Sequence, residues 1–252
     1  MFYPVILCTF AGLSTAIGGL IVILSGGVDN RKMAFSQGFA AGVMLAVSAG
    51  ELLPESFAGY YEYMPVMMAF KAVISLFFCG WIAGMGINGL AVPDYRETDG
   101  ENMAMARRMA VITTVVMVIH NMPEGVLTMF SSRQNEIVGA KLAAAVALHN
   151  IPEGMAIASP VLYVTQSRGR AFTQTFMAGM SELAGGLAAY VFLKSLITPR
   201  FMNGLMPVIA GIMCRAAICE LIPAGIKISD NRHTIYGILT GIVIIAIGLF
   251  VF

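Results

Sequence analysis

The sequence predicts an all-α polytopic membrane protein with eight transmembrane helices, and three observations carry this prediction. Of the 252 residues, 58% are hydrophobic and only 12% are charged, whereas soluble domains are roughly 45–50% apolar. The mean hydropathy is +0.81. A transmembrane helix needs about 20 mostly apolar residues, and eight stretches reach this length. They are 4–25, 34–57, 66–91, 108–130, 137–163, 171–193, 203–225 and 234–252. We expect residues 1–252 to form a single transmembrane domain.

The first stretch is predicted to be a retained span. No Lys or Arg precedes or interrupts the apolar run in the first 25 residues, and a signal peptide would carry such a charge. The connections between the later stretches are short. The longest runs from Pro93 to Arg107 and contains Asp94, Glu97, Asp99 and Glu101, so we expect a solvated, mobile loop there.

The positive charges predict the orientation. With the loops assigned to alternate sides, nine Lys and Arg residues lie on one face and five on the other, and Arg215 falls within a span. Because cytoplasmic loops carry the excess of positive charge, the face with nine is predicted to be cytoplasmic. Both termini are then extracytoplasmic.

The second and seventh stretches contain the same pattern. Gly42 is followed nine residues later by Glu51-Leu52-Leu53-Pro54, and Gly211 is followed nine residues later by Glu220-Leu221-Ile222-Pro223. The two stretches are five spans apart, so they cross the membrane in opposite directions. Such an inverted repeat is typical of secondary transporters. It predicts a 3+2+3 arrangement, in which helices 1–3 and 6–8 surround helices 4–5.

The two central stretches each contain a histidine and a glutamate one helical turn apart. His120-Asn121-Met122-Pro123-Glu124-Gly125 lies in the fourth stretch, and His149-Asn150-Ile151-Pro152-Glu153-Gly154 begins 29 residues later in the fifth. Residues at i and i+4 share one face of a helix, and this geometry is suited to a metal ion. Imidazole and carboxylate ligands fit Zn²⁺, Fe²⁺, Mn²⁺, Co²⁺ and Cd²⁺, because Cu(I) prefers thiolates. Asn121 and Asn150 could either add amide oxygens to the site or form hydrogen bonds between helices.

Proline in both motifs removes a backbone hydrogen bond. Pro123 and Pro152 cannot donate to the carbonyls of Ile119 and Leu148. An unsatisfied carbonyl in hydrocarbon costs several kcal/mol, so we expect these positions to line a polar cavity.

Six glutamates lie within the predicted spans. An acidic residue at mid-span costs roughly 2.5–3.5 kcal/mol, so protonation, pairing or a bound cation must compensate. The six glutamates are Glu51, Glu55, Glu124, Glu153, Glu182 and Glu220. Glu182 lies halfway through the sixth stretch and is predicted to be a fifth ligand. Glu55 is explained equally well as a helix-end residue that reaches water.

Several other classes of function are disfavoured. A net charge of +1 gives no basic footprint for nucleic acid. No GxxxxGK[ST] loop is present, so any transport must be driven by a gradient or by an unseen partner. Ser181 is not followed by the glycine of a G-x-S-x-G motif, because Leu183 stands there. The four cysteines form no CxxC pair and are interpreted as packing residues.

The paired HNxPEG motifs resemble those of the ZIP (Zrt/Irt-like) divalent-metal transporters, near the bacterial, GufA-like branch. The similarity includes Gly38-Phe39-Ala40-Ala41-Gly42-Val43-Met44-Leu45 and the Glu-Leu-x-Pro segments of the second and seventh stretches. The resemblance implies extracellular termini and import of Zn²⁺ or a related ion. It implies a principal metal site at His120, Glu124, His149, Glu153 and Glu182, and a second position that involves Asn121 and Asn150. Glu51 and Glu55 would lie toward the outer mouth, and Glu220 toward the cytoplasmic exit.

The sequence departs from the family pattern in two places. The loop between the third and fourth stretches contains no histidine. Arg215 stands in the seventh stretch where similar proteins carry an apolar or aromatic residue, and Cys219 stands where an acidic residue often precedes the glutamate. Arg215 keeps its charge, so it either pairs with an intramembrane carboxylate and modulates the charge of the site, or reaches a water-filled cavity.

The predicted function is therefore a secondary transporter that imports divalent metal ions by alternating access. A selective metal channel and a zinc-dependent intramembrane hydrolase are the alternatives. No enzyme activity and no cofactor are expected beyond the transported ion. The expected surroundings are a lipid bilayer, with a bacterial inner membrane preferred and a homodimer considered.

Overall fold

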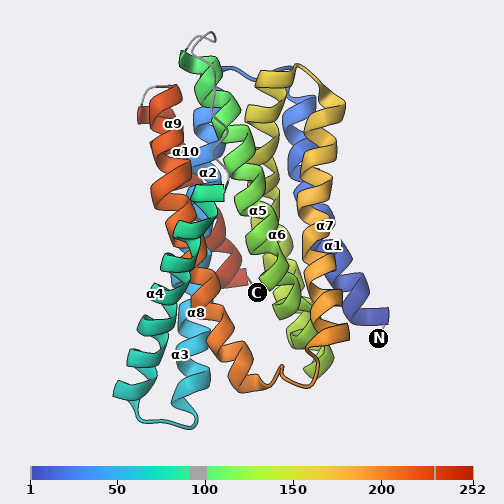
Figure 1. Ribbon diagram of the computed structural model, residues 1–252, viewed down its shortest axis with the longest axis vertical. Helices are drawn as coiled ribbons and strands as arrows, with labels where there is room; N and C mark the ends of the chain where they lie inside the picture. Colours follow the sequence, from blue (N-terminus) through green and yellow to red (C-terminus); the bar gives the residue numbers. More distant parts are fainter. Residues whose placement is uncertain (1, 91–100, 230, 252) are drawn as a thin grey trace.

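The protein is a bundle of long helices. The computed structural model describes residues 2–90, 101–229 and 231–251, and this part of the chain is helical without strands (Figure 1). The helices are α1 (Phe2–Leu24), α2 (Asn30–Val47), α3 (Leu53–Tyr61), α4 (Val66–Leu90), α5 (Glu101–Gln134), α6 (Glu136–Thr165), α7 (Arg168–Phe192), α8 (Pro199–Ala216), α9 (Ile222–Ile228) and α10 (Asn231–Val251). The π-helices η1 (Ser48–Leu52) and η2 (Ala217–Leu221) join α2 to α3 and α8 to α9.

Six helices in the described ranges are long and apolar enough to cross a membrane, which confirms an all-α polytopic membrane protein. The predicted fifth and sixth stretches form α6 and α7, which have 30 and 25 residues but are not among those six. They carry polar residues such as His149, Asn150 and Glu182, which are buried in the protein. A helix that is shielded from lipid by its neighbours does not need a fully apolar surface.

One predicted loop is shorter than expected. Asp94, Glu97 and Asp99 lie outside the described residues, but α5 begins at Glu101, so the prediction that the loop extends to Arg107 is wrong. The first turns of α5 continue the helix beyond the apolar stretch, because helical backbone hydrogen bonds do not depend on the membrane.

Side-chain caps define where several helices begin. Asp29 Oδ1 accepts a hydrogen bond from the Lys32 amide (2.8 Å) before α2. Asn135 Oδ1 accepts from Ile137 (2.9 Å) before α6, and Thr198 Oγ1 accepts from the Phe201 amide (3.2 Å) before α8. These oxygens satisfy amides that have no partner in the first helical turn.

The two π-helices occupy equivalent positions in the predicted repeat. Each begins six residues after its glycine, Gly42 or Gly211, and each has its glutamate as the fourth residue. The segments α2–η1–α3 and α8–η2–α9 run in opposite directions (Figure 1). The repeat therefore has a structural counterpart, while the 3+2+3 arrangement stays a prediction.

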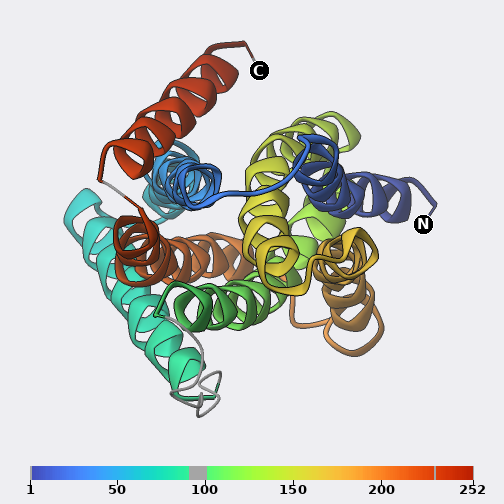
Figure 2. The ribbon, with the colours of Figure 1, turned by 90° about the horizontal axis from the view of Figure 1, so that it is seen from above.

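The helices separate into two bundles (Figure 2). In the first bundle, α1 packs mainly on α6 and α7, and α5 packs mainly on α7 and α6. In the second bundle, α2 packs mainly on α10, and α4 packs mainly on α8. The main contact between the bundles is that of α2 with α6.

Glycines bring the helices of the first bundle into backbone contact. A Cβ on Gly179 of α7 would lie 2.0 Å from the carbonyl oxygen of Gly12 of α1. A Cβ on Gly125 of α5 would lie 1.8 Å from the Glu182 carbonyl oxygen, and one on Gly154 of α6 would lie 1.9 Å from the Thr15 carbonyl oxygen. Small residues permit such approach in membranes, so all four helices of this bundle are locked together at the level of the metal motifs.

Candidate metal centre

The two motifs face each other across α5 and α6. His120 Nε2 lies 3.1 Å from Glu153 Oε1, and His149 Nε2 lies 3.5 Å from Glu124 Oε1. Each histidine thus contacts the glutamate of the other helix. The motif prolines do not interrupt either helix, since α5 and α6 continue through Pro123 and Pro152.

Three side chains in the described residues can converge on one metal ion. His120, Glu124 and Glu153 each offer a ligand atom, and these atoms lie within 4.8 Å of one another. All three are buried, with exposed fractions of 0%, 3% and 0%. Nitrogen and carboxylate oxygen in a set of three suit Zn²⁺ and its neighbours.

The hydrogen bonds of the cluster favour a cation. His120 Nδ1 lies 3.2 Å from the Val116 carbonyl oxygen, which can only accept, so Nδ1 carries the proton in the neutral ring. Nε2 then directs a lone pair toward Glu153 Oε1, an arrangement that is repulsive unless a proton or a metal cation lies between them. Glu124 Oε2 and Glu153 Oε2 have no hydrogen-bond partner, and buried carboxylate oxygens without partners are costly.

His149 lies beside this group. Its contact with Glu124 at 3.5 Å has ion-pair distance but lacks hydrogen-bond geometry, and both ring nitrogens have no hydrogen-bond partner. The ring is 3% exposed, so its two nitrogens are buried beside the cluster without a hydrogen-bond partner.

Glu182 of α7 is held in an adjacent polar network. Asn150 Nδ2 donates to Glu182 Oε2 (2.8 Å), and Thr128 Oγ1 donates to Glu182 Oε1 (3.4 Å). Glu182 is fully buried but is not one of the three residues whose ligand atoms converge. Glu182 therefore lies next to the cluster of His120, Glu124 and Glu153 but is not part of it.

The two asparagines link the helices through their amide nitrogens. Asn121 Nδ2 donates to the Ala178 carbonyl oxygen (3.1 Å), and Asn150 Nδ2 donates to the Ala11 carbonyl oxygen (2.9 Å). Both Oδ1 atoms are buried without a partner. Hydrogen bonding between helices is therefore present, and an amide oxygen also remains for a ligand.

An acidic cavity approaches the centre from one end of the molecule. It has a volume of about 580 Å³ and is lined by Glu51, Glu55, Glu62 and Lys141 among others. A narrow neck of about 10 Å³ shares Val47, Glu51 and Leu142 with this cavity and also touches Glu124 and His149. Such a volume corresponds to about one water molecule, so a hydrated ion cannot pass without losing water or widening the neck.

Two charged residues of this cavity were missed by the sequence analysis. Glu62 follows Glu55 by seven residues and so continues the same helical face, which was a usable signal. Lys141 falls within the predicted fifth span and was counted only as a loop charge for orientation.

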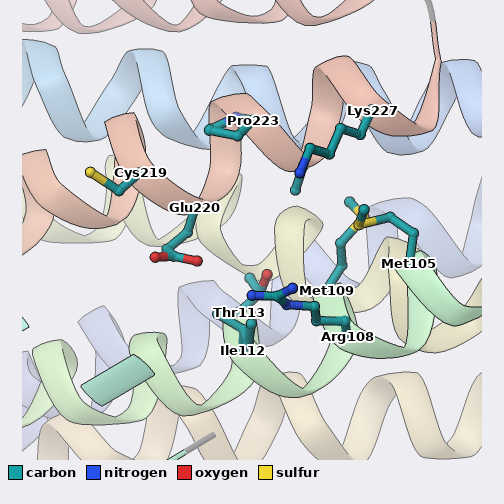
Figure 3. Close-up of a pocket in the computed structure, with 10 residues that line it drawn as sticks. Met105, Arg108, Met109, Ile112, Thr113, Cys219, Glu220, Pro223 and Lys227 are labelled. Carbon is teal, nitrogen blue, oxygen red and sulfur yellow. The ribbon is translucent and has the colours of Figure 1, made fainter. Parts of the chain in front are cut away.

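Glu220 lies at the opposite end. A cavity of about 80 Å³ there is lined by residues including Arg108, Glu220 and Lys227, and Figure 3 shows these three side chains directed toward the same space. Arg215 Nη2 is 4.0 Å from Glu220 Oε1, and Cδ of Arg215 lies against Gly84 of α4. Both charged side chains are mostly shielded, with exposed fractions of 13% and 16%.

A buried histidine–carboxylate cluster inside a bundle of long apolar helices defines a polytopic membrane protein with a candidate cation site. The chain belongs to the ZIP zinc transporter family, whose model matches residues 88–248.

Three relatives are similar over nearly their whole length, and each is named zinc transporter ZupT. The protein of Escherichia fergusonii is 36% identical, with 100% of this chain and 97% of the relative covered. That of Chlorobium chlorochromatii is 33% identical over 98% and 96%, and that of an Escherichia coli strain is 35% identical over 99% and 96%. The family consists of transporters, in agreement with the prediction that the chain is not an enzyme.

Proposed function

We propose that this protein imports divalent transition-metal ions, with Zn²⁺ as the principal substrate, by alternating access through the centre formed by α5 and α6. The observation that carries the proposal is the convergence of His120, Glu124 and Glu153 in the protein interior, with two carboxylate oxygens that lack partners. The similarity to zinc transporters over the full chain supports it. Fe²⁺, Mn²⁺, Co²⁺ and Cd²⁺ suit the same ligands and are proposed as further substrates.

The ion is proposed to enter from the end that carries the acidic cavity. This end also carries the N-terminus of α1, and the distribution of Lys and Arg supports an extracytoplasmic position for it. The ion passes Glu55 and Glu51, loses water in the neck, and reaches Glu124 and His149. Metal ligands must be deprotonated, so binding is expected to release protons.

The opposite side of the centre is closed by contacts between the bundles. Gln37 Nε2 of α2 donates to the Ala156 carbonyl oxygen of α6 (2.8 Å), and the hydroxyls of Ser36 and Ser159 form a hydrogen bond. All three side chains are buried. Movement of the first bundle against the second requires these contacts to break, which makes them the proposed inner gate.

All proposed ligands lie in the first bundle. His120, Asn121 and Glu124 are on α5, His149, Asn150 and Glu153 on α6, and Glu182 on α7. Movement of this bundle against the second carries the whole site from one side to the other. We propose that His149 and Glu182 complete the principal metal site. Asn121 and Asn150 are proposed to offer their amide oxygens to a second metal position. Arg215 is proposed to offset part of the negative charge of Glu220 on the exit side.

A selective channel would use the same ligands but needs a continuous pore. The neck of about 10 Å³ and the buried hydrogen bonds of Gln37 and Ser36 favour a carrier. A bacterial inner membrane, extracytoplasmic termini and a homodimer belong to the proposal.

Zinc uptake by the purified protein in proteoliposomes tests the proposal. We expect saturable uptake that the double variant His120→Ala/Glu124→Ala abolishes. Glu136→Ala is a control, because this glutamate lies exposed at the start of α6, two helical turns or more from the motif. Retained uptake in a double variant that is still monodisperse and helical would contradict the site, and a linear, unsaturable flux would favour the channel.

A further inference from the structure

The outer cavity carries opposite charges on its two walls. Glu51 and Glu55 belong to the continuous helix α2–η1–α3 of the second bundle and Glu62 caps its C-terminal end, whereas Lys141 belongs to α6 of the first. These four are the charged side chains among the residues that line it. One lysine and three glutamates therefore line the same cavity from different bundles.

Lys141 lines the wide part of the cavity and is not among the residues that line the neck. It lies eight residues before His149 on α6, and its neighbour Leu142 lines both the cavity and the neck. The lysine side chain is a flexible stem with a compact charge at its end. An ion that enters the cavity therefore meets this charge together with the carboxylates.

We propose that Lys141 is a specificity-determining residue, which acts as a resident cation that ions entering the acidic cavity must displace. The inference rests on the proposed transport function. With Lys141, three negative charges and one positive charge leave the cavity with a net charge of −2, which one divalent ion neutralises. Without it, the net charge is −3, and the carboxylates attract any cation more strongly.

The chemistry of the carboxylates explains why such a group is useful. Carboxylate oxygens are hard ligands that suit Mg²⁺ and Ca²⁺ as well as Zn²⁺, and the cavity contains no histidine or thiolate to discriminate among them. A tethered ammonium lowers the occupancy of every ion there. Zn²⁺ then benefits because the histidines beyond the neck draw it onward, whereas Mg²⁺ and Ca²⁺ gain nothing from them.

Initial rates of Zn²⁺ uptake in proteoliposomes test the inference with Lys141→Gln, Lys141→Arg and Lys71→Gln. Lys71 is an exposed residue of α4 that does not line the cavity, so its variant controls for surface charge in general.

In Lys141→Gln we expect the KM for Zn²⁺ to fall about threefold to tenfold at low ionic strength, with little change in kcat. The difference should shrink at high salt, because exposed charges are then screened. Inhibition by Mg²⁺ should appear at about tenfold lower concentration. Lys141→Arg and Lys71→Gln should both behave like the unmodified protein.

A titration with Tb³⁺, a hard cation that prefers carboxylate oxygens, supplies a readout that does not depend on transport. We expect Lys141→Gln to bind Tb³⁺ more tightly and the double variant Lys141→Gln/Glu55→Gln to lose this gain. An unchanged KM, Mg²⁺ inhibition and Tb³⁺ affinity in Lys141→Gln would overturn the inference and leave the proposed function intact. Equal changes in Lys71→Gln would also overturn it. An unmodified protein that takes up no Zn²⁺ would instead refute the proposed function.

Discussion

His120 on α5 and Glu153 on α6 form the shorter of the two histidine–glutamate contacts between the metal motifs, with Nε2 3.1 Å from Oε1 and both side chains fully buried. Because the Nδ1 proton is directed to the Val116 carbonyl oxygen, this pair needs a cation between its two atoms. A neutral replacement of the carboxylate therefore separates metal binding from folding.

Glu153→Gln should lower zinc affinity and uptake at least about 100-fold, because it removes one of three converging ligands. The fold should persist or become slightly more stable, since a buried charge is removed. Isothermal titration of zinc and thermal unfolding in detergent check both statements. Glu136→Gln, at the exposed start of the same helix, should change neither; zinc affinity that survives in Glu153→Gln would remove this residue from the site.

The two histidines should not be equivalent. His120 belongs to the converging group, whereas His149 lies beside it with both nitrogens free of hydrogen bonds. We expect His120→Ala to weaken zinc binding about tenfold more than His149→Ala. Equal losses in direct binding measurements would mean that the bound state places the two rings symmetrically.

Glu182 should behave as a supporting residue in the metal-free protein. Its carboxylate accepts from Asn150 and Thr128, so Glu182→Gln should weaken zinc binding about tenfold, less than Glu153→Gln does. Asn150→Ala leaves a buried carboxylate with a single donor and should lower the free energy of unfolding by about 1–3 kcal/mol. A loss as complete as that of Glu153→Gln would show that the two carboxylates contribute equally to the loaded site, and an unchanged zinc affinity would remove Glu182 from it.

Gly179→Ala should destabilise the first bundle. The added Cβ would lie 2.0 Å from the Gly12 carbonyl oxygen, and a backbone contact cannot give way as a side chain can. We expect a loss of about 1–3 kcal/mol, measured as a lower thermal midpoint. Gly86→Ala on α4 is the matched control, since a Cβ there meets nothing within 4 Å; a similar shift in both variants would show that helix packing is not the cause.

Arg215 should influence exit more than binding. Its guanidinium is 4.0 Å from Glu220, on the side opposite the acidic cavity. Arg215→Met is expected to lower kcat for uptake about threefold, because Glu220 then holds the leaving cation more strongly, and to leave KM nearly unchanged. Unaltered kcat in a well-folded variant would argue that Arg215 only fills space against Gly84.

Most of the fold follows from sequence because hydropathy reports directly on the solvent around each helix. The spans are of this kind, and the central motifs follow from the spacing of their histidines and glutamates. The contact between His120 and Glu153 could not be predicted, since the i and i+4 spacing fixes positions on one helix but not the rotation of α5 against α6.

The two π-helices could not be predicted from the sequence either, because the composition of Ser48–Leu52 and Ala217–Leu221 does not differ from that of an ordinary α-helix. Glu62 and Lys141 were overlooked because they stand near helix ends, where charge usually means contact with water.

The glycine contacts that lock α1, α5, α6 and α7 together have a thermodynamic consequence. A ligand set carried in a solid body keeps the same internal geometry whichever compartment it faces, and therefore the same intrinsic affinity for the ion. Such a device cannot accumulate metal by itself. The sign of net flux must come from the electrochemical difference, between the two compartments, of the ions that the protein moves, and with that difference reversed the same protein would run backward.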